Sequence, residues 1–321
     1  MGIGPFGAPP SGRPLVGVLF GGYPQAWHSD LLGRLQRRSY DVRIAYAEGQ
    51  WPSNGGGTSL LEQQAAALVA LNPSVILTTD TPGTLAASAA TSTIPIVAPI
   101  SASPVRAPIL KHVDNIIGLS DDPSASSSAT RLNMLIELLG GPGAVKSAAV
   151  IWNSTNPGKD LEINELREVG RSLIPSVIVH DFPVCYPTYN FSAVMDKIVN
   201  APTPYSAVLV QEDPVVFQNH LFILSVLRSH GVPCMWDSAP PLLAGGLVAF
   251  GPDRPAAFRW AANMADQVIT NRWVPGTGNP NFGIAPIPHG QWQTYINPAA
   301  AQAHNLGVPR TLQGNLVWPF P

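Results

Sequence analysis

The chain has 321 residues, more than the roughly 250 to 300 at which a single hydrophobic core stops growing, so its length predicts two domains. Only 12% of the residues are charged and 45% are hydrophobic, and the net charge of −2 comes without a basic cluster, which argues against nucleic acid as a partner. No run of about 18 apolar residues occurs, so the sequence predicts no membrane span.

Strand-like and helix-like segments alternate through the first half of the chain. Strands are expected at 16–20, 41–46, 74–77, 94–97 and 115–118, and helices at 27–38, 59–71 and 81–90. The helix at 81–90 is predicted to start with Thr81 as its cap and Pro82 in its first turn. Alternation of this kind is typical of parallel sheets that helices cover on both faces.

The second half repeats the course of the first. Strands are expected at 148–152, 176–180, 206–209, 232–235, 246–249 and 292–296, and helices at 122–139, 160–173, 191–199, 214–230, 255–270 and 298–305. The first five strands start between 131 and 138 positions after their counterparts, for example 148 against 16. A period this long indicates duplicated lobes and not a solenoid.

We therefore predict an α/β protein of two Rossmann-like, doubly wound lobes with strand order 2-1-3-4-5, joined by a three-segment hinge. The predicted boundaries are 15–119 plus 252–282 for the first lobe and 120–251 plus 283–308 for the second, with flexible ends at 1–14 and 309–321. The hinge is expected at 118–123, at 250–253 and near 282–285, where the strand sets end.

In such sheets ligands gather beyond the carboxyl ends of the strands. The residues predicted there are Gly22, Tyr23, Asp80, Thr81, Pro82, Gly83 and Ser101 in the first lobe, and Trp152, Asn153, Glu212, Asp213, Trp236 and Asp237 in the second. These acids, hydroxyls and aromatics suit a zwitterion, or a carboxylate with an apolar body.

Each of these residues also has a purely structural interpretation. The backbone N–H groups of Gly83 and Thr84 suit a carboxylate at a helix N-terminus, or Thr81 only caps that helix. Asp213 suits an ammonium group, or it caps the helix that follows. Trp152 and Trp236, which we expect to point together toward the cleft, stack on a flat ligand with Tyr23, or belong to the core. Trp27 and Trp51 are weaker candidates of the same kind.

Strong catalytic motifs do not occur in the sequence, so we expect no enzyme, no catalytic residue and no cofactor. The seven histidines lack metal-ligand spacing, and we expect them in loops or at the surface, with no metal. Cys185 and Cys234 are placed on strands with two others between them, too far apart for a disulfide.

A family resemblance rests on a series of motifs in one order over about residues 15–308. These are Thr81-Pro82 with the run AASAATSTIPIV at 86–97, Gly118-Leu119-Ser120, Trp152-Asn153-Ser154-Thr155-Asn156-Pro157-Gly158, Asp213-Pro214, Gly245-Gly246-Leu247, Gly251-Pro252-Asp253 and Ile296-Asn297. The chain resembles the ABC-transporter substrate-binding family that includes tryptophan-binding lipoproteins.

The resemblance implies a type I periplasmic-binding-protein fold, in which the ligand is captured by hinge closure. It places the family's Thr-Pro turn on Thr81 and Pro82, its Asn-Pro loop on Asn156, and its Asp-Pro loop on Asp213. Three departures from the family pattern are noted, one of which is the missing lipoprotein leader, which bears on location and not on fold. Residues 102–105 read Ala-Ser-Pro-Val where Gly-Asp-Pro-Val is common, and 236–238 read Trp-Asp-Ser where Tyr-Gly-Ser is frequent.

The expected function is the solute-binding component of an ABC uptake transporter, a monomer that delivers a small ligand, an amino acid or aromatic carboxylate, to an ABC permease. Two alternatives stay open: a cleft enzyme of the glycosyltransferase or epimerase type, and a cytoplasmic ligand sensor. The expected location is periplasmic, and the alternative is cytoplasmic, because residues 1–14 are rich in glycine and proline and lack the apolar segment of a signal peptide.

Overall fold

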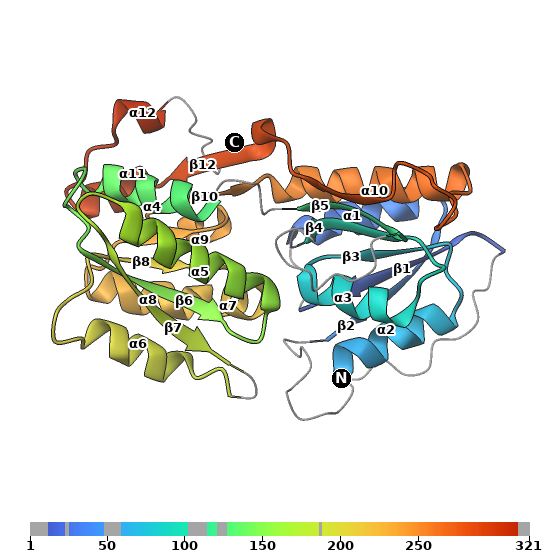
Figure 1. Ribbon diagram of the computed structural model, residues 1–321, viewed down its shortest axis with the longest axis horizontal. Helices are drawn as coiled ribbons and strands as arrows, with labels where there is room; N and C mark the ends of the chain where they lie inside the picture. The colour runs from blue at the N-terminus through green and yellow to red at the C-terminus, as the bar shows by residue number, and fades with distance from the viewer. Residues whose placement is uncertain are drawn as a thin grey trace. The chain divides into compact units, whose positions relative to one another are not determined.

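The computed structural model describes residues 12–22, 26–47, 59–101, 114–120, 127–185 and 188–313. The chain forms two compact units, Met1–Asp122 with Asp253–Ile287 and Pro123–Pro252 with Pro288–Pro321, and passes between them three times (Figure 1). None of the helices in the described ranges combines the length and the hydropathy needed to span a bilayer.

The first unit is built on a parallel sheet. Its elements are β1 (Leu15–Phe20), α1 (Ala26–Arg37), β2 (Asp41–Tyr46), α2 (Leu60–Ala70), β3 (Val75–Thr78), α3 (Thr81–Ala90), β4 (Ile96–Ser101), β5 (Ile116–Ser120), α10 (Arg254–Thr270) and β11 (Gly283–Pro286). The described strands lie in the order β2-β1-β3-β4-β5-β11, each parallel to its neighbours. The predicted order 2-1-3-4-5 is confirmed, with a sixth strand added at one edge.

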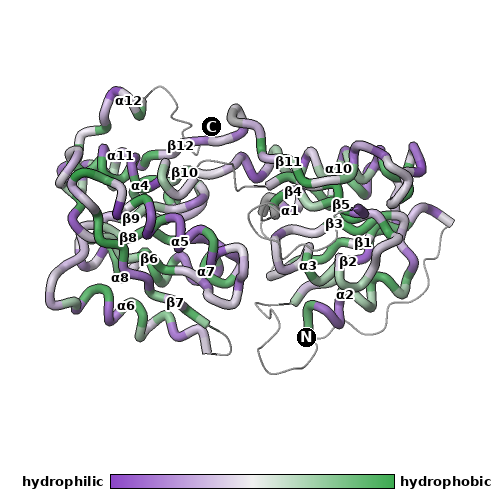
Figure 2. The backbone as a smooth tube through the Cα atoms, viewed as in Figure 1, coloured by the Kyte–Doolittle hydropathy of each residue, from purple (hydrophilic) through white to green (hydrophobic). Residues whose placement is uncertain are grey.

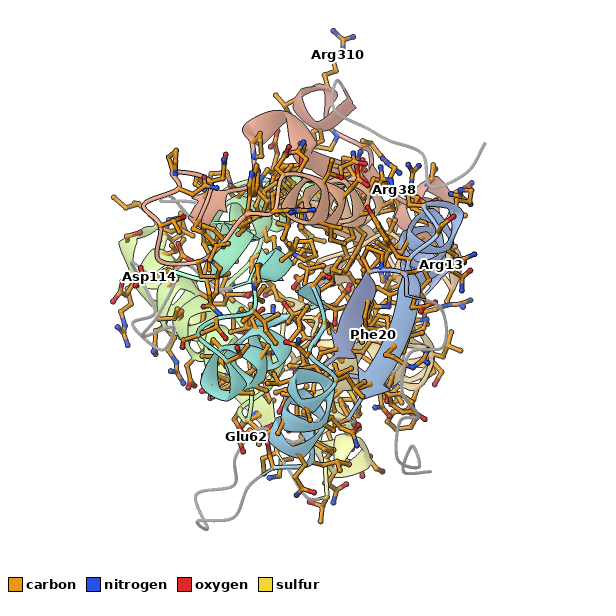
Figure 3. The ribbon with its side chains drawn as sticks, turned by 90° about the vertical axis from the view of Figure 1, so that its right-hand side faces the viewer. Arg13, Phe20, Arg38, Glu62, Asp114 and Arg310 are labelled. Atoms are coloured by element: carbon orange, nitrogen blue, oxygen red, sulfur yellow. The ribbon has the colours of Figure 1, made fainter. Side chains whose placement is uncertain are left out.

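Helices cover both faces of this sheet because its strands are apolar on both sides. Along β1, Val16, Val18 and Phe20 pack against α1 and α10, whereas Leu19 faces α2 and α3. Figure 3 shows Phe20 surrounded by other side chains, with Arg38 and Glu62 toward the periphery of the same unit.

Helix α10 closes one face of the first unit although it follows the whole of the second unit's first segment in sequence. Its buried residues are mostly small, which allows close packing: Ala257, Phe258, Ala261, Ala262, Ala265 and Val268. Two polar contacts fasten it to the loop after α1. The Arg38 guanidinium donates to the Ala262 carbonyl at 2.6 Å, and the Tyr40 hydroxyl donates to Asp266 at 2.6 Å.

The second unit follows the same plan. Its elements are α4 (Ser127–Leu138), β6 (Ser147–Asn153), α5 (Pro157–Ser172), β7 (Ile178–Val184), α6 (Phe191–Val199), β8 (Ala207–Val210), α7 (Pro214–Gln218), α8 (His220–Ser229), β9 (Cys234–Trp236), α9 (Pro240–Leu243), β10 (Val248–Pro252), the 3-10 turn His289–Gln291, β12 (Trp292–Ile296), α11 (Pro298–Ala303) and α12 (Arg310–Gln313). The described strands lie in the order β7-β6-β8-β9-β10-β12, and only β12 is antiparallel to its neighbour.

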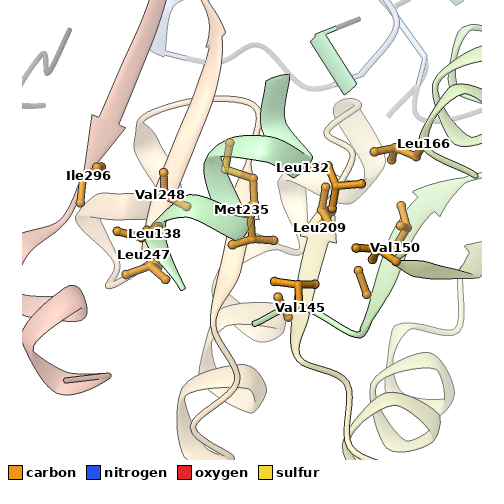
Figure 4. Close-up of a cluster of buried hydrophobic side chains, with 14 of the residues drawn as sticks. Leu132, Leu138, Val145, Val150, Leu166, Leu209, Met235, Leu247, Val248 and Ile296 are labelled. Atoms are coloured by element: carbon orange, nitrogen blue, oxygen red, sulfur yellow. The ribbon is translucent and has the colours of Figure 1, made fainter. Parts of the chain in front are cut away.

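Two hydrophobic cores lie on the two faces of this second sheet. On one face, Val150, Leu209 and Met235 pack against α4 and α5, as Figure 4 shows with Leu132 and Leu138 of α4. On the other face, Ile151 and Val208 pack against α6 and α8. Figure 2 shows the resulting pattern, in which hydrophobic colour runs along inner strands such as β1 and β6.

The internal duplication is visible in the observed strands. The first, third and fifth strands of the two units start 132 positions apart, at 15 and 147, 75 and 207, and 116 and 248. The two-lobed α/β fold predicted from this repeat is confirmed.

Several boundaries differ from the sequence prediction. Residues 283–286, expected in the hinge and the second lobe, form β11 and pair with β5 in the first unit. The single helix expected at 214–230 is two helices, because Asn219 lies between them and its side chain donates to the Val215 carbonyl at 2.9 Å. Residues 309–321 were expected to form a flexible end. They contain α12, and Leu312 of this helix is buried in the same core as α4. The short helix α9 was not expected.

Candidate functional site

The carboxyl ends of the strands in the first unit are organised around Asp80, which follows β3. Asp80 is the N-cap of α3, and its Oδ1 accepts a hydrogen bond from the Gly83 N–H at 2.7 Å. Its Oδ2 accepts from the Thr79 hydroxyl at 2.9 Å and from the Gly21 N–H, at the end of β1, at 3.0 Å. One carboxylate therefore joins the ends of β1 and β3 to the start of α3.

This arrangement corrects the predicted role of Thr81, because the cap is Asp80 and Thr81 is the first residue of the helix. The N–H groups expected to bind a ligand carboxylate also already have acceptors within the protein. The Gly83 N–H already donates to Asp80, and the Thr84 N–H donates to the Asp80 carbonyl at 3.0 Å. A ligand carboxylate at this helix would have to displace a carboxylate of the protein itself.

Close packing holds this corner of the first unit together. A Cβ at Gly21 would lie 2.3 Å from Asp80 Oδ1, so only glycine fits beneath the carboxylate. Gly22 and Pro82 are buried. Tyr23, Trp51, residues 102–105 and the side chains of Trp27 and Ser101 lie outside what the structure describes.

In the second unit, Asp213 after β8 is the counterpart of Asp80. It caps α7 by accepting from the Val216 N–H at 2.8 Å, and its Oδ2 accepts from the amides of Asn153 at 2.5 Å and Asn156 at 3.4 Å. Burial raises the pKa of Asp213, and these three hydrogen bonds and Lys159 oppose that rise. The predicted cap is confirmed.

Asp80 and Asp213 thus make the same connection in both units. In each case one carboxylate oxygen binds the first turn of the carboxylate's own helix and the other binds the end of the unit's first strand. The partner is a backbone N–H in the first unit and an asparagine side chain in the second. Asn156 in turn caps α5, since its Oδ1 accepts from the Gly158 N–H at 3.1 Å.

Glu212 and Asp237 join the ends of β8 and β9. The Glu212 N–H donates to Asp237 Oδ2 at 3.0 Å, and the Asp237 N–H donates to Glu212 Oε1 at 3.1 Å. Glu212 also accepts from the N–H of Ser238 at 3.0 Å and from its hydroxyl at 2.6 Å. Both carboxylates are buried, and backbone donors supply much of their hydrogen bonding.

Asp237 also belongs to a group of four buried or half-buried charges that we call the charge quartet: Arg131, Lys159, Glu162 and Asp237. Arg131 Nη1 lies 3.2 Å from Asp237 and 3.3 Å from Glu162, and Lys159 Nζ lies 2.7 Å from Glu162 and 3.5 Å from Asp237. The Arg131 Nε–H donates to the Phe250 carbonyl at 2.9 Å. Because the quartet holds two positive and two negative charges, its formal charge is zero.

Trp152 and Trp236 do not form a pair. Trp152 belongs to the core on the α4 and α5 face of the sheet, and Trp236 to the core on the α6 and α8 face. Trp236 is fully buried, and its indole N–H donates to Cys234 Sγ at 3.1 Å. The expectation that both indoles point toward one cleft is wrong, because the side chains lie on opposite faces of the sheet.

Trp152 instead has Gln211 as its neighbour. The Gln211 N–H donates to the Ile151 carbonyl at 2.9 Å, which continues the parallel ladder of β6 and β8 by one residue. Gln211 lies two residues after Leu209 and so faces the same core as Trp152. Both side chains are buried, and Trp152 Nε1, Gln211 Oε1 and Gln211 Nε2 have no hydrogen-bond partner among the described residues. An unpaired buried polar group costs about 1 to 3 kcal/mol.

Sequence reasoning missed Arg131 and Lys159, and it placed Gln211 in a loop at the carboxyl ends of the strands without naming it as a binding residue. Arg131 lies within the helix expected at 122–139 and Lys159 just before the one expected at 160–173. A cation four residues before the buried Leu135 or Ile163 lies on the same helix face, which is a sign that it has a buried partner. Gln211 directly precedes two predicted site residues, and its alternation with Leu209 places it inward. Among the described residues no cluster of histidine, cysteine or acidic side chains could hold a metal ion.

Two further sequence expectations concern histidine and cysteine. His28 is buried between the rings of Phe20 and Phe258, with both ring centroids at 4.7 Å, and so does not lie at the surface as expected. Burial, together with Arg254, lowers the pKa of His28 to about 3. Cys185 and Cys234 are free thiols, one exposed and one buried.

No protein-family model and no curated protein sequence matches the chain. Solved structures do match it along nearly its whole length. A conserved domain protein from Vibrio cholerae has a TM-score of 0.77 at 18% identity, covering 95% of this chain and 99% of that one. The ABC domain in complex with L-Trp from Streptococcus pneumonia has a TM-score of 0.75 at 16% identity, covering 94% and 99%.

An ABC transporter solute binding protein from Bacillus halodurans with bound myo-inositol has a TM-score of 0.62 at 15% identity, covering 92% of this chain and 99% of that one. Transcriptional regulators of the LacI type are also among the matching structures. The chain has the type I periplasmic-binding-protein fold, with two α/β units of this architecture in series.

Proposed function

We propose that this protein is the solute-binding component of an ABC uptake transporter. The observation that carries the proposal is the match of both units, over 94% of this chain and 99% of the other, to an ABC domain in complex with L-Trp. The neighbour that binds myo-inositol adds a second ABC solute-binding protein of the same fold. Catalysis is not part of the proposal.

We propose further that the ligand is held between the two units at the carboxyl ends of their strands, and that the units close on it about the three chain crossings at 122–123, 252–253 and 287–288. The residues proposed to bound this site include Asp80, Asn153, Glu212, Asp213 and Asp237. In this proposal the protein works as a monomer outside the cytoplasm and delivers its ligand to an ABC permease.

The chemistry of the ligand follows in part from the contacts described above. An aromatic body stays in the proposal because a neighbour of the same fold is in complex with L-Trp. A free carboxylate is less well supported than the sequence suggested, since the Gly83 N–H is bonded to Asp80. The acids after β3, β8 and β9 favour a ligand without negative charge at these strand ends.

Mass spectrometry of the gently purified protein under native conditions tests the proposal. A retained small molecule is expected, and adding it back to stripped protein should reduce the radius of gyration in solution scattering. Stripped protein that binds no small molecule from a complete metabolite extract, or an unchanged radius of gyration with saturating ligand, would overturn the proposed function.

A cytoplasmic ligand sensor is the second candidate, because LacI-type regulators share the fold. The two functions differ in what deletion of the gene does. Loss of a transporter component abolishes uptake of the labelled ligand and leaves transcription of other genes without a direct effect. Loss of a sensor alters transcription while uptake by the permease itself continues.

A further inference from the structure

We propose that Gln211 and Trp152 form a subsite for an uncharged polar group of the ligand, one that both accepts and donates hydrogen bonds. This inference rests on the proposed function and names the ligand chemistry of that site. Gln211 follows β8 directly, and the strand register places it next to Trp152 of β6 and on the same side of the sheet. Their polar atoms have no partner among the described residues.

The unpaired atoms define what they can bind. Trp152 Nε1 is a donor only, Gln211 Nε2 is a donor, and Gln211 Oε1 is an acceptor. A carboxylate offers only acceptors and would leave Gln211 Oε1 unpaired, whereas an ammonium group offers only donors and would leave both N–H groups unpaired. A hydroxyl or a carboxamide offers both kinds of atom, so it can complement all three.

The charged side chains nearby lead to the same chemistry. Within the charge quartet, Arg131 and Lys159 are each shared between Glu162 and Asp237, so the two cations already have anionic partners. Glu212 and Asp213 add two formal negative charges, and at least three hydrogen bonds from described residues reach each of them. An anionic group beside Gln211 would meet this excess of negative charge, while an uncharged group would not.

An apolar residue at position 211 would leave no unpaired amide in the core. A leucine of similar size would fill the same space without an unpaired amide. Solvent does not reach the Gln211 side chain, which is 2% exposed, so bulk water does not supply the missing partners. A ligand group that pairs with the amide would explain a glutamine at this position.

The test compares probes that differ in charge and share a shape. Nicotinamide with nicotinate is the carboxamide pair, and glucose with glucuronate is the hydroxyl pair. Calorimetry on stripped protein is carried out for wild type, Gln211→Leu, Gln211→Glu and Trp152→Phe, with the exposed Gln302→Leu of α11 as the matched control.

At least one uncharged probe should bind wild type tenfold or more tightly than its charged counterpart. Gln211→Leu and Gln211→Glu should each lose tenfold or more of that affinity, Trp152→Phe several-fold, and Gln302→Leu none. The melting temperature of Gln211→Leu without ligand should equal or exceed that of wild type, because an unpaired amide is removed.

Three results of the binding measurements would each overturn the inference. These are charged probes that bind as well as the uncharged ones, Gln211→Leu with full affinity for an uncharged probe, and no binding of any of the four probes at millimolar concentration. A melting temperature of Gln211→Leu well below that of wild type would do so as well, since it would show a structural partner for the amide. If the retained ligand is charged and Gln211→Leu binds it with unchanged affinity, the proposed solute-binding role stands and only the proposed subsite is rejected.

Discussion

Glu212 and Asp237 each donate a backbone N–H to the other's carboxylate, at 3.0 and 3.1 Å. Two buried acids thus lie side by side on adjacent strands without a cation between them in this exchange. The repulsion between them is reduced because each negative charge is stabilised by backbone dipoles, and Asp237 also contacts Arg131 and Lys159. The carboxyl ends of β8 and β9 are fixed by this exchange.

The same chemical change at these two residues should have different costs. Glu212→Gln keeps an acceptor for the N–H groups of Asp237 and Ser238, so we expect a loss of about 1 kcal/mol in the free energy of unfolding. Asp237→Asn removes a negative charge that both Arg131 and Lys159 contact, and we expect a loss of about 3 to 5 kcal/mol. Urea denaturation measures both. Asp30→Asn, which breaks an exposed pair with Arg34, is the control and should cost about 0.5 kcal/mol. Equal losses at Glu212 and Asp237 would contradict this account.

Asp213 should tolerate neither removal nor amidation. Its two oxygens accept from the Val216 N–H and from the amides of Asn153 and Asn156, so Asp213→Asn places a new N–H₂ against existing donors. We expect a loss of about 1 to 3 kcal/mol at pH 7, although the variant removes a buried charge whose pKa is raised.

The raised pKa of Asp213 fixes the sign of its pH effect. A carboxyl whose folded pKa lies above the unfolded value contributes stability below the unfolded pKa and loses it as the pH rises through the folded pKa. The penalty of Asp213→Asn should therefore be smaller at pH 7 than the hydrogen bonds alone suggest. A variant as stable as wild type at pH 7 in thermal unfolding would show that the three donors have other acceptors.

Gly251 in β10 has no space for a side chain. A Cβ at this position would lie 1.8 Å from the Asp237 carbonyl oxygen, a backbone atom that cannot rotate away. Gly251→Ala should therefore separate the ends of β9 and β10 and cost about 3 kcal/mol or more. Gly307→Ala is the matched control, since nothing lies within 4 Å of its added Cβ. The melting temperatures of the two variants should differ clearly, and similar values would show that β10 can shift without loss.

His28 should make the stability of the protein depend on pH below 6.5. The folded pKa of about 3 lies below the ordinary histidine pKa of 6.5, so the unfolded chain takes up a proton at a pH where the folded chain does not. The stability present above pH 6.5 is then lost as the pH falls, by about 2 kcal/mol between pH 6.5 and 5. His28→Phe should remove that part of the slope in urea unfolding. An identical slope in the variant would mean that His28 stays neutral in both states or charges in both.

The fold follows from the sequence more completely than the site does. The alternation of strands and helices and the constant repeat spacing predict the strand order, because each of these is a local pattern. The start of α3 shows where local patterns stop being sufficient. Thr81 and Asp80 are both good caps, and Asp80 is favoured because its second oxygen binds the Gly21 N–H, 59 positions away.

The charge quartet was outside the reach of sequence reasoning for the same reason. Arg131, Lys159 and Asp237 come from two helices and a strand end, and their pairing depends on which faces of α4 and α5 meet the sheet. Unlike the charge quartet, the placement of Trp152 and Trp236 on opposite faces of the sheet could be predicted. Side chains alternate between the faces along β6 and β9, so the register of these strands determines which face each indole occupies. The sequence prediction considered each indole's strand end and not its face.

The position of α10 in the sequence has a consequence for how the chain folds during synthesis. Helix α10 begins only after 133 further residues, 121–253, have been made beyond the end of β5, and β11 comes later still. At about 5 to 20 residues per second, this takes roughly 7 to 27 s. Through that interval the face formed by Val16, Val18 and Phe20 has α1 but lacks α10, the second helix that covers it. We expect a nascent chain stalled at residue 252 to be cut by protease within 15–120 and the released full chain to resist, because the unit that begins first stays incomplete until α10 and β11 have been made.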